Sequence, residues 1–423
     1  MRTAQTVLVT LGLALFAACG GNGGSDADAQ LKVWYHTGKP AEKACMERLV
    51  AAYNAREPAV PVELVCIPEK SYDQKVATAA ASGSLPDVLD LDGPYVASYA
   101  WRGILRPLDG LVPAPATAGL LPSIAAQGTW RGSLYALGQF DSGLGLYCDR
   151  SKLAAIDARI PDSPEDAWSL EEFAQILADL AAKDADGQVL DLKLNDTGTE
   201  WPSYAFGPTL VSAGADWVER SDPVRATGTL DSPQAVRALT TIKSWIADGL
   251  VDPNTADDAF IERRVAISWV GHWMYPDYRQ ALGDDLVLVP LPDFGHGSRT
   301  GQGSWCWGVT RACERPDAAA AFIAFLLRDE SIAAMCAANG AVPASRAVIA
   351  DSPVYGPEGD LRLFATQLAT IAVPRPVTPA YPVITKSLHA AYHRIIKGAD
   401  PAVELAEAAE RIDREVTANQ GYP

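Results

Sequence analysis

The chain has few positive charges and, after its first residues, no long apolar run. Its 35 Lys and Arg residues stand against 52 Asp and Glu residues, which gives a formal net charge of −17. Such a surface repels phosphate backbones and shows no basic stripe, so binding of nucleic acid is excluded. No segment after residue 18 approaches the roughly 20 consecutive apolar residues of a membrane span, so we expect the remainder to fold in water.

The sequence also lacks the short motifs of common catalytic and cofactor sites. Its seven cysteines include no CxxC pair, which argues against structural zinc. It contains no nucleophile-elbow, zinc or glycine-rich phosphate signature. We therefore expect no metal, no cofactor and no enzymatic activity. The carboxylates of Asp141 and Glu200 stand near aromatic residues, however, so a glycoside hydrolase stays open as an alternative.

The first thirty residues have the pattern of a targeting and tethering segment. Arg2 precedes an apolar run over residues 7–16, and this run ends in two alanines and Cys19. Residues 19–30 are rich in glycine and polar residues, which is typical of a flexible tether. The ending resembles a bacterial lipobox, which implies that residues 1–18 are a signal peptide and that Cys19 is lipidated. Ordinary secretory cleavage that leaves a free Cys19 is the alternative.

The chain then begins a strand-helix-strand unit. Residues 31–36 are apolar-rich, residues 41–56 show helical spacing, and residues 60–67 return to strand character. A helix between two strands favours parallel pairing, and its first turn lies at the sheet edge where the second strand ends. We therefore predict a disulfide between Cys45 and Cys66. Two buried free thiols are the alternative.

Helical and strand patterns alternate along the rest of the chain, which favours an α/β architecture with parallel sheets. The spacing predicts helices over 72–82, 170–183, 233–248, 316–328, 330–338, 361–372 and 402–418, and strands over 86–91, 144–148, 265–270, 286–291 and 305–310.

Several tryptophans stand beside loop-forming residues rather than in periodic apolar runs. Trp201 precedes a proline, Trp273 follows Gly271-His272, and Trp305 follows Gly303-Ser304. A pyranose presents apolar faces and a rim of hydroxyl groups, so its site needs flat aromatic surfaces with polar partners. For any single tryptophan a core position is the alternative. The polar partners that accompany the set are Asp92, Asp141, Glu200 and Ser304.

A series of motifs occurs in an order that resembles the extracellular solute-binding proteins of sugar ABC transporters (family 1, maltose-binding-protein-like). The resemblance covers nearly the whole chain after the tether, and each motif is weak alone. The motifs are GSLPDV over 83–88, WRGILRPLD over 101–109, YALGQFDSGLGLYCDRSKL over 135–153, RRVAISWVGHW over 263–273, PLP over 290–292 with GSW over 303–305, and AVPASR over 341–346.

This resemblance implies a two-lobed periplasmic-binding-protein fold of type II. Each lobe would be a mostly parallel sheet flanked by helices, with the ligand in the cleft between the lobes. Strand crossings near Asp141, Pro290 and Asp329 would divide the chain. Lobe one would hold residues 31–141 and 290–329, and lobe two residues 142–289 and 330–423.

The resemblance also implies a set of ligand-binding residues. Asp92 and Asp141 would accept hydrogen bonds from hydroxyl groups, and the three tryptophans above would stack on sugar faces. Independently, ligands of open α/β sheets gather at the carboxyl ends of strands, where the first strand ends near His36 and Gly38. A structural histidine is the alternative for His36. The full set is Asp92, Asp141, Glu200, Trp201, Trp273, Ser304 and Trp305, with His36, Gly38 and Arg346 as further candidates.

We therefore expect the substrate-binding component of an importer. It would be a monomer, lipid-anchored to the bacterial cell envelope, that captures a mono- or small oligosaccharide and delivers it to membrane permease subunits. Anchoring in the periplasm and on the outer face of the cytoplasmic membrane are both open. A binder of a polyol or another small polar solute, a surface carbohydrate hydrolase and a sensor module are the alternatives.

Overall fold

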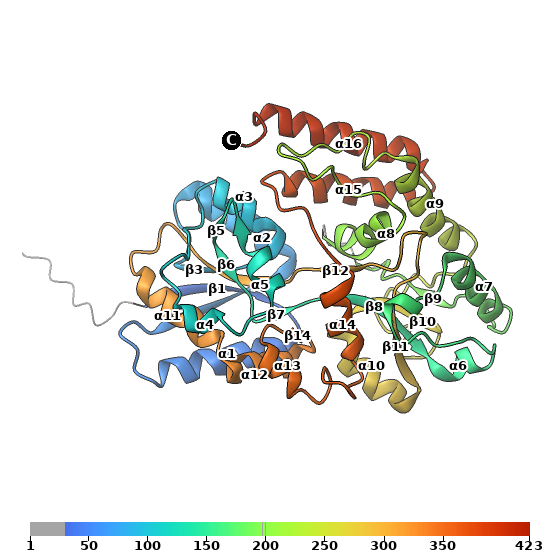
Figure 1. Ribbon diagram of the computed structural model, residues 1–423, viewed down its shortest axis with the longest axis horizontal. Helices are drawn as coiled ribbons and strands as arrows, with labels where there is room; N and C mark the ends of the chain where they lie inside the picture. Colours follow the sequence, from blue (N-terminus) through green and yellow to red (C-terminus); the bar gives the residue numbers. More distant parts are fainter. Residues whose placement is uncertain (1–29, 197, 199) are drawn as a thin grey trace, which may run out of the picture.

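The computed structural model describes residues 30–196, 198 and 200–423, and it has two α/β lobes side by side (Figure 1). Each lobe is built on one main sheet. The predicted α/β class and two-lobed architecture are confirmed. The predicted signal peptide, Cys19 and most of the tether lie outside the described residues.

The first sheet has the strand order β2-β1-β3-β13-β6. Strands β1 (Leu31–Thr37), β2 (Val62–Pro68) and β3 (Val88–Asp92) are parallel, as helices between them require. Strand β13 (Trp305–Val309) returns antiparallel to both β3 and β6 (Ala136–Leu137).

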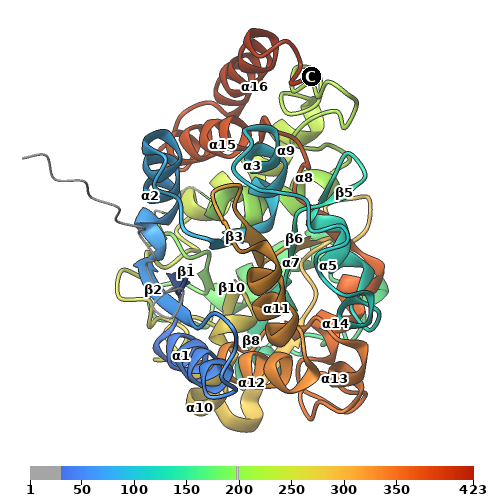
Figure 2. The same ribbon diagram turned by 90° about the vertical axis from the view of Figure 1, so that its left-hand side faces the viewer.

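Helices cover both faces of this sheet. On one face α1 (Pro40–Asn54), α11 (Pro316–Leu326) and α12 (Asp329–Asn339) pack against Val33 and Tyr35. On the other face lie α2 (Glu69–Ser82) and α3 (Val96–Trp101). Figure 2 shows the left-hand side of Figure 1. In this view α1 and α12 lie side by side below the sheet, and α2 lies above it.

The second sheet has the strand order β11-β8-β10-β9 and is mixed, not mostly parallel as expected. Strand β8 (Leu144–Asp149) is antiparallel to β10 (Ile267–Gly271) and β11 (Leu286–Val289). Only β10 and β9 (Leu190–Asp191) are parallel. The reason is that β8 arrives from the first lobe and runs against strands that start within the second.

Helix α7 (Leu170–Ala181) illustrates how the sequence determines where a helix begins and which face it buries. Ser169 caps its first turn, because its hydroxyl accepts a hydrogen bond from the Glu172 N–H at 3.1 Å. The helix buries the apolar stripe of Phe173, Ile176, Leu177 and Leu180 in the second core.

The remaining elements are short strands and the helices that close the two cores. They are η2 (Gly93–Tyr95), α4 (Ala114–Thr117), α5 (Pro122–Gln127), β4 (Thr129–Trp130), β5 (Ser133–Leu134), β7 (Phe140–Asp141), α6 (Arg150–Ala154), η3 (Pro164–Asp166), the π-helical turn η4 (Pro202–Phe206), α8 (Gly207–Ser212), α9 (Pro233–Ala247), η5 (His272–Met274), α10 (Tyr275–Leu282), η6 (Gly283–Asp285), β12 (Thr300–Gln302), β14 (Val342–Pro343), α13 (Arg346–Ala350), α14 (Arg362–Thr370), β15 (Ala372–Pro374), α15 (Tyr381–Ile395) and α16 (Pro401–Ala418).

Packing differs from the expected lobe boundaries at two places. We expected lobe one to end at residue 329, but Met335 and Ala344 lie in the core of the first sheet, because α12 packs along α1. We also expected lobe one to resume at residue 290. Leu291 instead packs in the second core, and β12 pairs with β15 on that side.

The cysteines differ from expectation as well. Cys45 and Cys66 are free thiols, so the predicted disulfide is wrong in this structure. Both side chains pack on the same apolar cluster, but Cys45 on α1 lies toward Cys336, whereas Cys66 lies toward Lys43. Neighbouring helix and strand ends therefore do not bring these two sulfurs together. Among the described residues, no helix is both long enough and apolar enough to span a membrane.

Candidate functional site

The carboxyl ends of the first sheet's parallel strands present one cluster of candidates. His36 lies near the end of β1 and Asp92 at the end of β3, while Trp305 begins β13 and is paired with Asp92 in register. The His36 ring stacks on the Trp305 indole at a centroid distance of 3.7 Å and an interplanar angle of 7°. Strand order thus brings together residues that are far apart in the sequence.

His36 is held by acidic partners within this lobe. It is buried, and its Nδ1 hydrogen-bonds the Asp90 carboxylate, while its Nε2 lies 3.9 Å from Glu42. Burial alone would lower the pKa of His36, but the carboxylates of Asp90 and Glu42 outweigh burial and raise it. These partners fit the structural interpretation of His36, and its ring also supports the Trp305 platform.

Arg375 joins Asp92 of the first lobe to Glu200 of the second. Its Nη1 and Nη2 donate to the two Asp92 oxygens at 2.8 and 2.7 Å, and its Nη1 also donates to Glu200 Oε2 at 3.0 Å. The hydroxyl groups of Tyr95 and Tyr381 donate to Glu200 as well. Burial raises the pKa of Glu200 above its usual range although the Arg375 guanidinium opposes this shift.

A second polar connection runs through His272 at the end of β10. Its Nε2 lies 2.9 Å from the Ser142 hydroxyl, which in turn lies 3.2 Å from the Ser304 hydroxyl. Its Nδ1 lies 3.2 Å from the carbonyl oxygen of Asn339 in the first lobe. Burial, opposed by that carbonyl and assisted by the charge of Lys39, lowers the pKa of His272 to about 4. The ring is therefore neutral near pH 7, and its Nδ1–H donates to the carbonyl oxygen of Asn339.

The aromatic candidates of the second lobe form one cluster. The Trp273 ring lies 6.3 Å from Trp201 and 6.1 Å from Tyr204. Trp273 is partly exposed, whereas Trp201 is buried and donates its indole N–H to Leu192. A Cβ at Gly271 would lie 2.1 Å from the Trp273 ring, so glycine is needed for the indole to fold over the backbone.

The three remaining candidates, Asp141, Gly38 and Arg346, contact other parts of the protein. Asp141 is fully buried and accepts hydrogen bonds from the N–H groups of Ser142 and Gly303, so it fastens the crossing strands. Gly38 allows close approach of Glu42, whose carboxylate would lie 1.9 Å from a Cβ there. Arg346 is exposed at the start of α13, where its backbone N–H donates to Gly119 away from the cluster.

Arg375 and five other residues that contact the predicted candidates or Arg375 did not appear among the sequence-based candidates. The sequence offered one signal, because Arg375 stands alone between two prolines in the apolar segment 371–383. A lone charge in such a segment indicates a buried partner. The others are Tyr95, Gln127, Tyr204, His272 and Tyr381.

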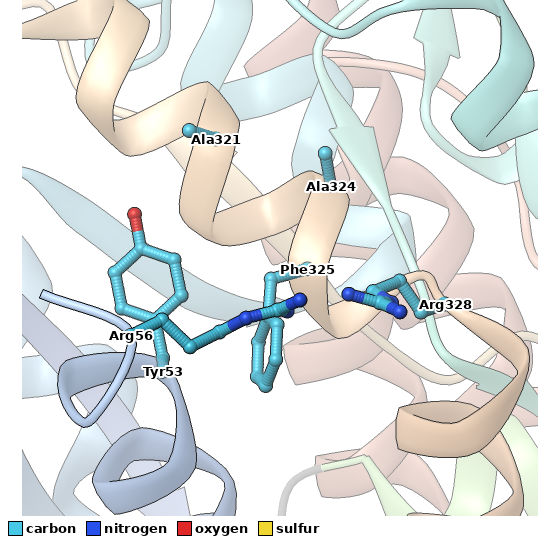
Figure 3. Close-up of a pocket in the computed structure, with 6 residues that line it drawn as sticks. All are labelled: Tyr53, Arg56, Ala321, Ala324, Phe325 and Arg328. Carbon is cyan, nitrogen blue, oxygen red and sulfur yellow. The ribbon is translucent and has the colours of Figure 1, made fainter. Parts of the chain in front are cut away.

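A hollow of about 350 Å³ lies elsewhere, on the outer side of the first lobe between α1 and α11 (Figure 3). The Arg56 guanidinium lies over the Phe325 ring there, at 5.4 Å from its centroid. None of the predicted ligand residues lines this hollow. Among the described residues, no cluster of three His, Cys, Asp or Glu side chains is arranged to hold a metal ion.

Comparison with known proteins agrees with this architecture. An uncharacterized lipoprotein from the oleD 5′ region of Streptomyces antibioticus is 27% identical over 366 residues, which is 84% of this chain and 79% of that protein. The GacH receptor of Streptomyces glaucescens superimposes with a TM-score of 0.77 at 24% identity, over 93% of this chain and 99% of that one. An ABC transporter solute-binding protein from Thermotoga lettingae, bound with α-D-tagatose, gives a TM-score of 0.78 at 20% identity, over 92% and 99%.

A family model matches well over half of the chain. The model describes the bacterial extracellular solute-binding proteins and aligns with residues 48–357. The aligned part includes the second main sheet and all strands of the first sheet except β1, whereas Arg375 lies outside it. This chain belongs to the bacterial extracellular solute-binding protein family.

Proposed function

We propose that this protein captures a mono- or small oligosaccharide between its two lobes and delivers it to the permease of an ABC importer. One observation carries the proposal. Arg375 donates to Asp92 of the first lobe and to Glu200 of the second. Trp305 is paired in register with Asp92, and Trp273 lies 6.1 Å from the Tyr204 ring that Arg375 covers. Aromatic faces beside paired carboxylates, hydroxyl groups and amides are the groups that a hydroxyl-rich ring requires.

The division of the chain follows from the packing. Lobe one would hold residues 31–141 and about 304–345, and lobe two the remaining described residues. A solute that touches both lobes favours their closed arrangement, because only this arrangement supplies both sets of contacts. In this proposal Trp273 and Trp305 stack on the sugar, and Asp92 and Glu200 accept its hydroxyl hydrogens.

The similar proteins support a carbohydrate ligand and a membrane anchor. The GacH receptor was crystallised with acarbose, and the Thermotoga protein with tagatose, and both ligands are rich in hydroxyl groups. The Streptomyces antibioticus relative is a lipoprotein. We extend this anchor to Cys19 of the present chain, with the protein acting as a monomer at the cell envelope.

Binding without catalysis agrees with the state of the acidic residues. Glycoside hydrolysis needs one carboxylic acid and one carboxylate flanking the scissile bond. Asp141 is instead fully buried against backbone N–H groups, and Glu200 is tied to Arg375 and two tyrosines.

Calorimetric titration of the mature chain tests the proposal. The panel would contain maltose, maltotriose, acarbose and D-tagatose, with sorbitol to represent polyols. We expect at least one sugar to bind, and Trp273→Ala to weaken its binding by about tenfold to a hundredfold through loss of the aromatic face. Trp130→Ala is the matched control, because Trp130 lies on β4 beside Tyr135 and Arg131, away from the cluster.

Two outcomes would count against the proposal. Absence of heat with every sugar, or equal affinity of the Trp273→Ala variant, would remove the assigned site. Release of reducing ends from the oligosaccharides would indicate a hydrolase instead.

A further inference from the structure

Arg375 holds an unusual position for a charged side chain. It follows β15, and only 5% of its side chain is exposed. Its guanidinium lies 5.2 Å from the Tyr204 ring centroid and 5.9 Å from that of Tyr381. A buried guanidinium persists only where its charge and its hydrogen bonds are matched.

The guanidinium already donates hydrogen bonds to the two carboxylates that we propose to bind the ligand. Both oxygens of Asp92 accept from Arg375, and Glu200 Oε2 accepts from Arg375 and Tyr381. The remaining oxygen, Glu200 Oε1, accepts from Tyr95 at 2.8 Å. Every oxygen of the two carboxylates therefore has a donor within the protein.

One hydrogen-bond donor of Arg375 has no acceptor among the described residues. Its Nε–H is buried and has no partner among the described residues, and the same holds for the amide Nε2 of Gln127. A Cβ at Gly303 would approach Arg375 Nη2 at 3.4 Å and Gln127 Oε1 at 3.3 Å, so both residues meet at this glycine. A buried donor without a partner, such as the Arg375 Nε–H, suits a ligand oxygen that accepts hydrogen bonds.

We propose that Arg375 is a specificity-determining residue, which reserves the site for neutral hydroxylated solutes and rejects solutes that carry an amine next to Asp92 and Glu200. The inference rests on the proposed solute-binding function. A hydroxyl group can share a carboxylate oxygen and also accept from the free Nε–H. A protonated amine would need a carboxylate of its own and would face the guanidinium at close range, where like charges repel strongly.

Removal of the guanidinium would then create a cation site. In Arg375→Ala the Asp92 and Glu200 carboxylates lose their counter-charge. A small cation with the shape of the guanidinium group can then bind in its place. Methylguanidinium is the probe, at millimolar concentration and with NaCl as the ionic-strength control. We expect it to raise the thermal midpoint of the variant by about 2 °C or more and to leave the wild type unchanged.

A sugar of the same ring with an amine gives the second readout. D-glucosamine should bind Arg375→Ala at least about tenfold more tightly than it binds the wild type, which corresponds to the lower range for close buried charge pairs. D-glucose is the neutral comparison. Arg375→Gln serves where the alanine variant does not fold, and it should change in the same direction.

Two controls separate a specific site from general effects. Arg328→Ala removes an arginine whose partner is the exposed Glu330, and it should gain no methylguanidinium stabilisation. The triple variant Arg375→Ala/Asp92→Asn/Glu200→Gln removes the carboxylates as well and should lose the gain.

Equal stabilisation of the single and triple variants would overturn the inference, as would wild-type binding of glucosamine as tight as that of glucose. The methylguanidinium result needs no sugar. A failed sugar panel would therefore contradict the proposed function, while a failed methylguanidinium test would contradict the role of Arg375.

Discussion

His36 and His272 are the two buried histidines of the described residues, and their environments shift their pKa values in opposite directions. His36 faces the carboxylates of Asp90 and Glu42, which raise its pKa above the usual value despite its burial. His272 faces a carbonyl oxygen and a serine hydroxyl, with the positive charge of Lys39 nearby, so burial lowers its pKa to about 4. The same residue type therefore pairs with carboxylates in one lobe and forms a neutral hydrogen-bonding link in the other.

The depressed pKa of His272 predicts a loss of stability in acid. The unfolded chain binds a proton at this side chain near pH 6.5, whereas the folded protein resists protonation down to about pH 4. The contribution of the neutral ring is thus complete above about pH 6.5 and is lost as the pH falls toward 4, by about 3 kcal/mol at most. Urea denaturation of the wild type and of His272→Gln, from pH 8 to pH 4.5, measures it.

The glutamine variant keeps one donor and one acceptor, so it should show a smaller decrease in stability between pH 6.5 and pH 4.5. Parallel curves for the two proteins would show that His272 does not titrate in this way.

At this scale the sequence predicted the residue types of the cluster better than their roles. Asp92 and Glu200 share the Arg375 guanidinium, and Trp305 is paired in register with Asp92, because these residues stand at strand ends or turns that the sequence marks. Asp141 turns inward to backbone N–H groups, and only coordinates can show this orientation. Arg375 was missed because its partners are 283 and 175 residues away in the chain.

At the scale of elements, the turn between β10 and η5 sets the position of the Trp273 ring. The strand ends at Gly271, whose backbone is extended, and the indole folds back over this residue. The turn also carries His272, so a single short segment supplies both an aromatic face and a polar link to the first lobe.

Gly271→Ala should therefore impair ligand binding through Trp273. Its methyl group would require the indole to rotate away from a 2.1 Å contact. We expect sugar affinity to fall by at least about tenfold, as for loss of the ring itself, with a smaller effect on thermal stability. Calorimetry measures the affinity.

Gly119→Ala is the control, because a Cβ there meets no atom within 4 Å. Unchanged affinity in Gly271→Ala would mean that the ring position does not depend on this glycine.

Most elements could be predicted within a few residues of their ends, because their periodicity is clear in α7, α9 and β8. Helix α15 was missed, since the proline-rich segment before it and Pro382 in its first turn hide the helical spacing. Proline is compatible with a first helical turn, because its missing N–H has no partner there. The mixed second sheet was also not predicted, since the direction of β8 depends on where the chain crosses between lobes.

At the scale of the whole molecule, contacts between the lobes extend beyond the cluster. Helices α15 and α16 pack on α9 and η4 of the second lobe, and α15 also contacts α3 of the first lobe (Figure 1). The Trp101 ring packs edge-on against Tyr422 at 5.0 Å, and Arg131 donates to the Tyr422 carbonyl oxygen at 3.0 Å. Lys39 of the first lobe also pairs with Asp277 of the second.

These contacts explain why the sequence could predict two lobes but not their boundaries. The motif order predicted crossings between the lobes, whereas the boundaries proposed near 304 and 345 depend on α12 packing along α1 and on β12 pairing with β15. Such packing joins segments that no local pattern connects.

The central claim is that a sugar lies between the lobes and touches both of them. A crystal structure of the mature chain with the tightest-binding sugar of the panel tests this claim most directly. The account predicts a ring between the Trp273 and Trp305 indoles, with hydroxyl groups within hydrogen-bonding distance of Asp92, Glu200 or Arg375. A sugar bound on the outer face of one lobe, for instance in the hollow between α1 and α11, would contradict it.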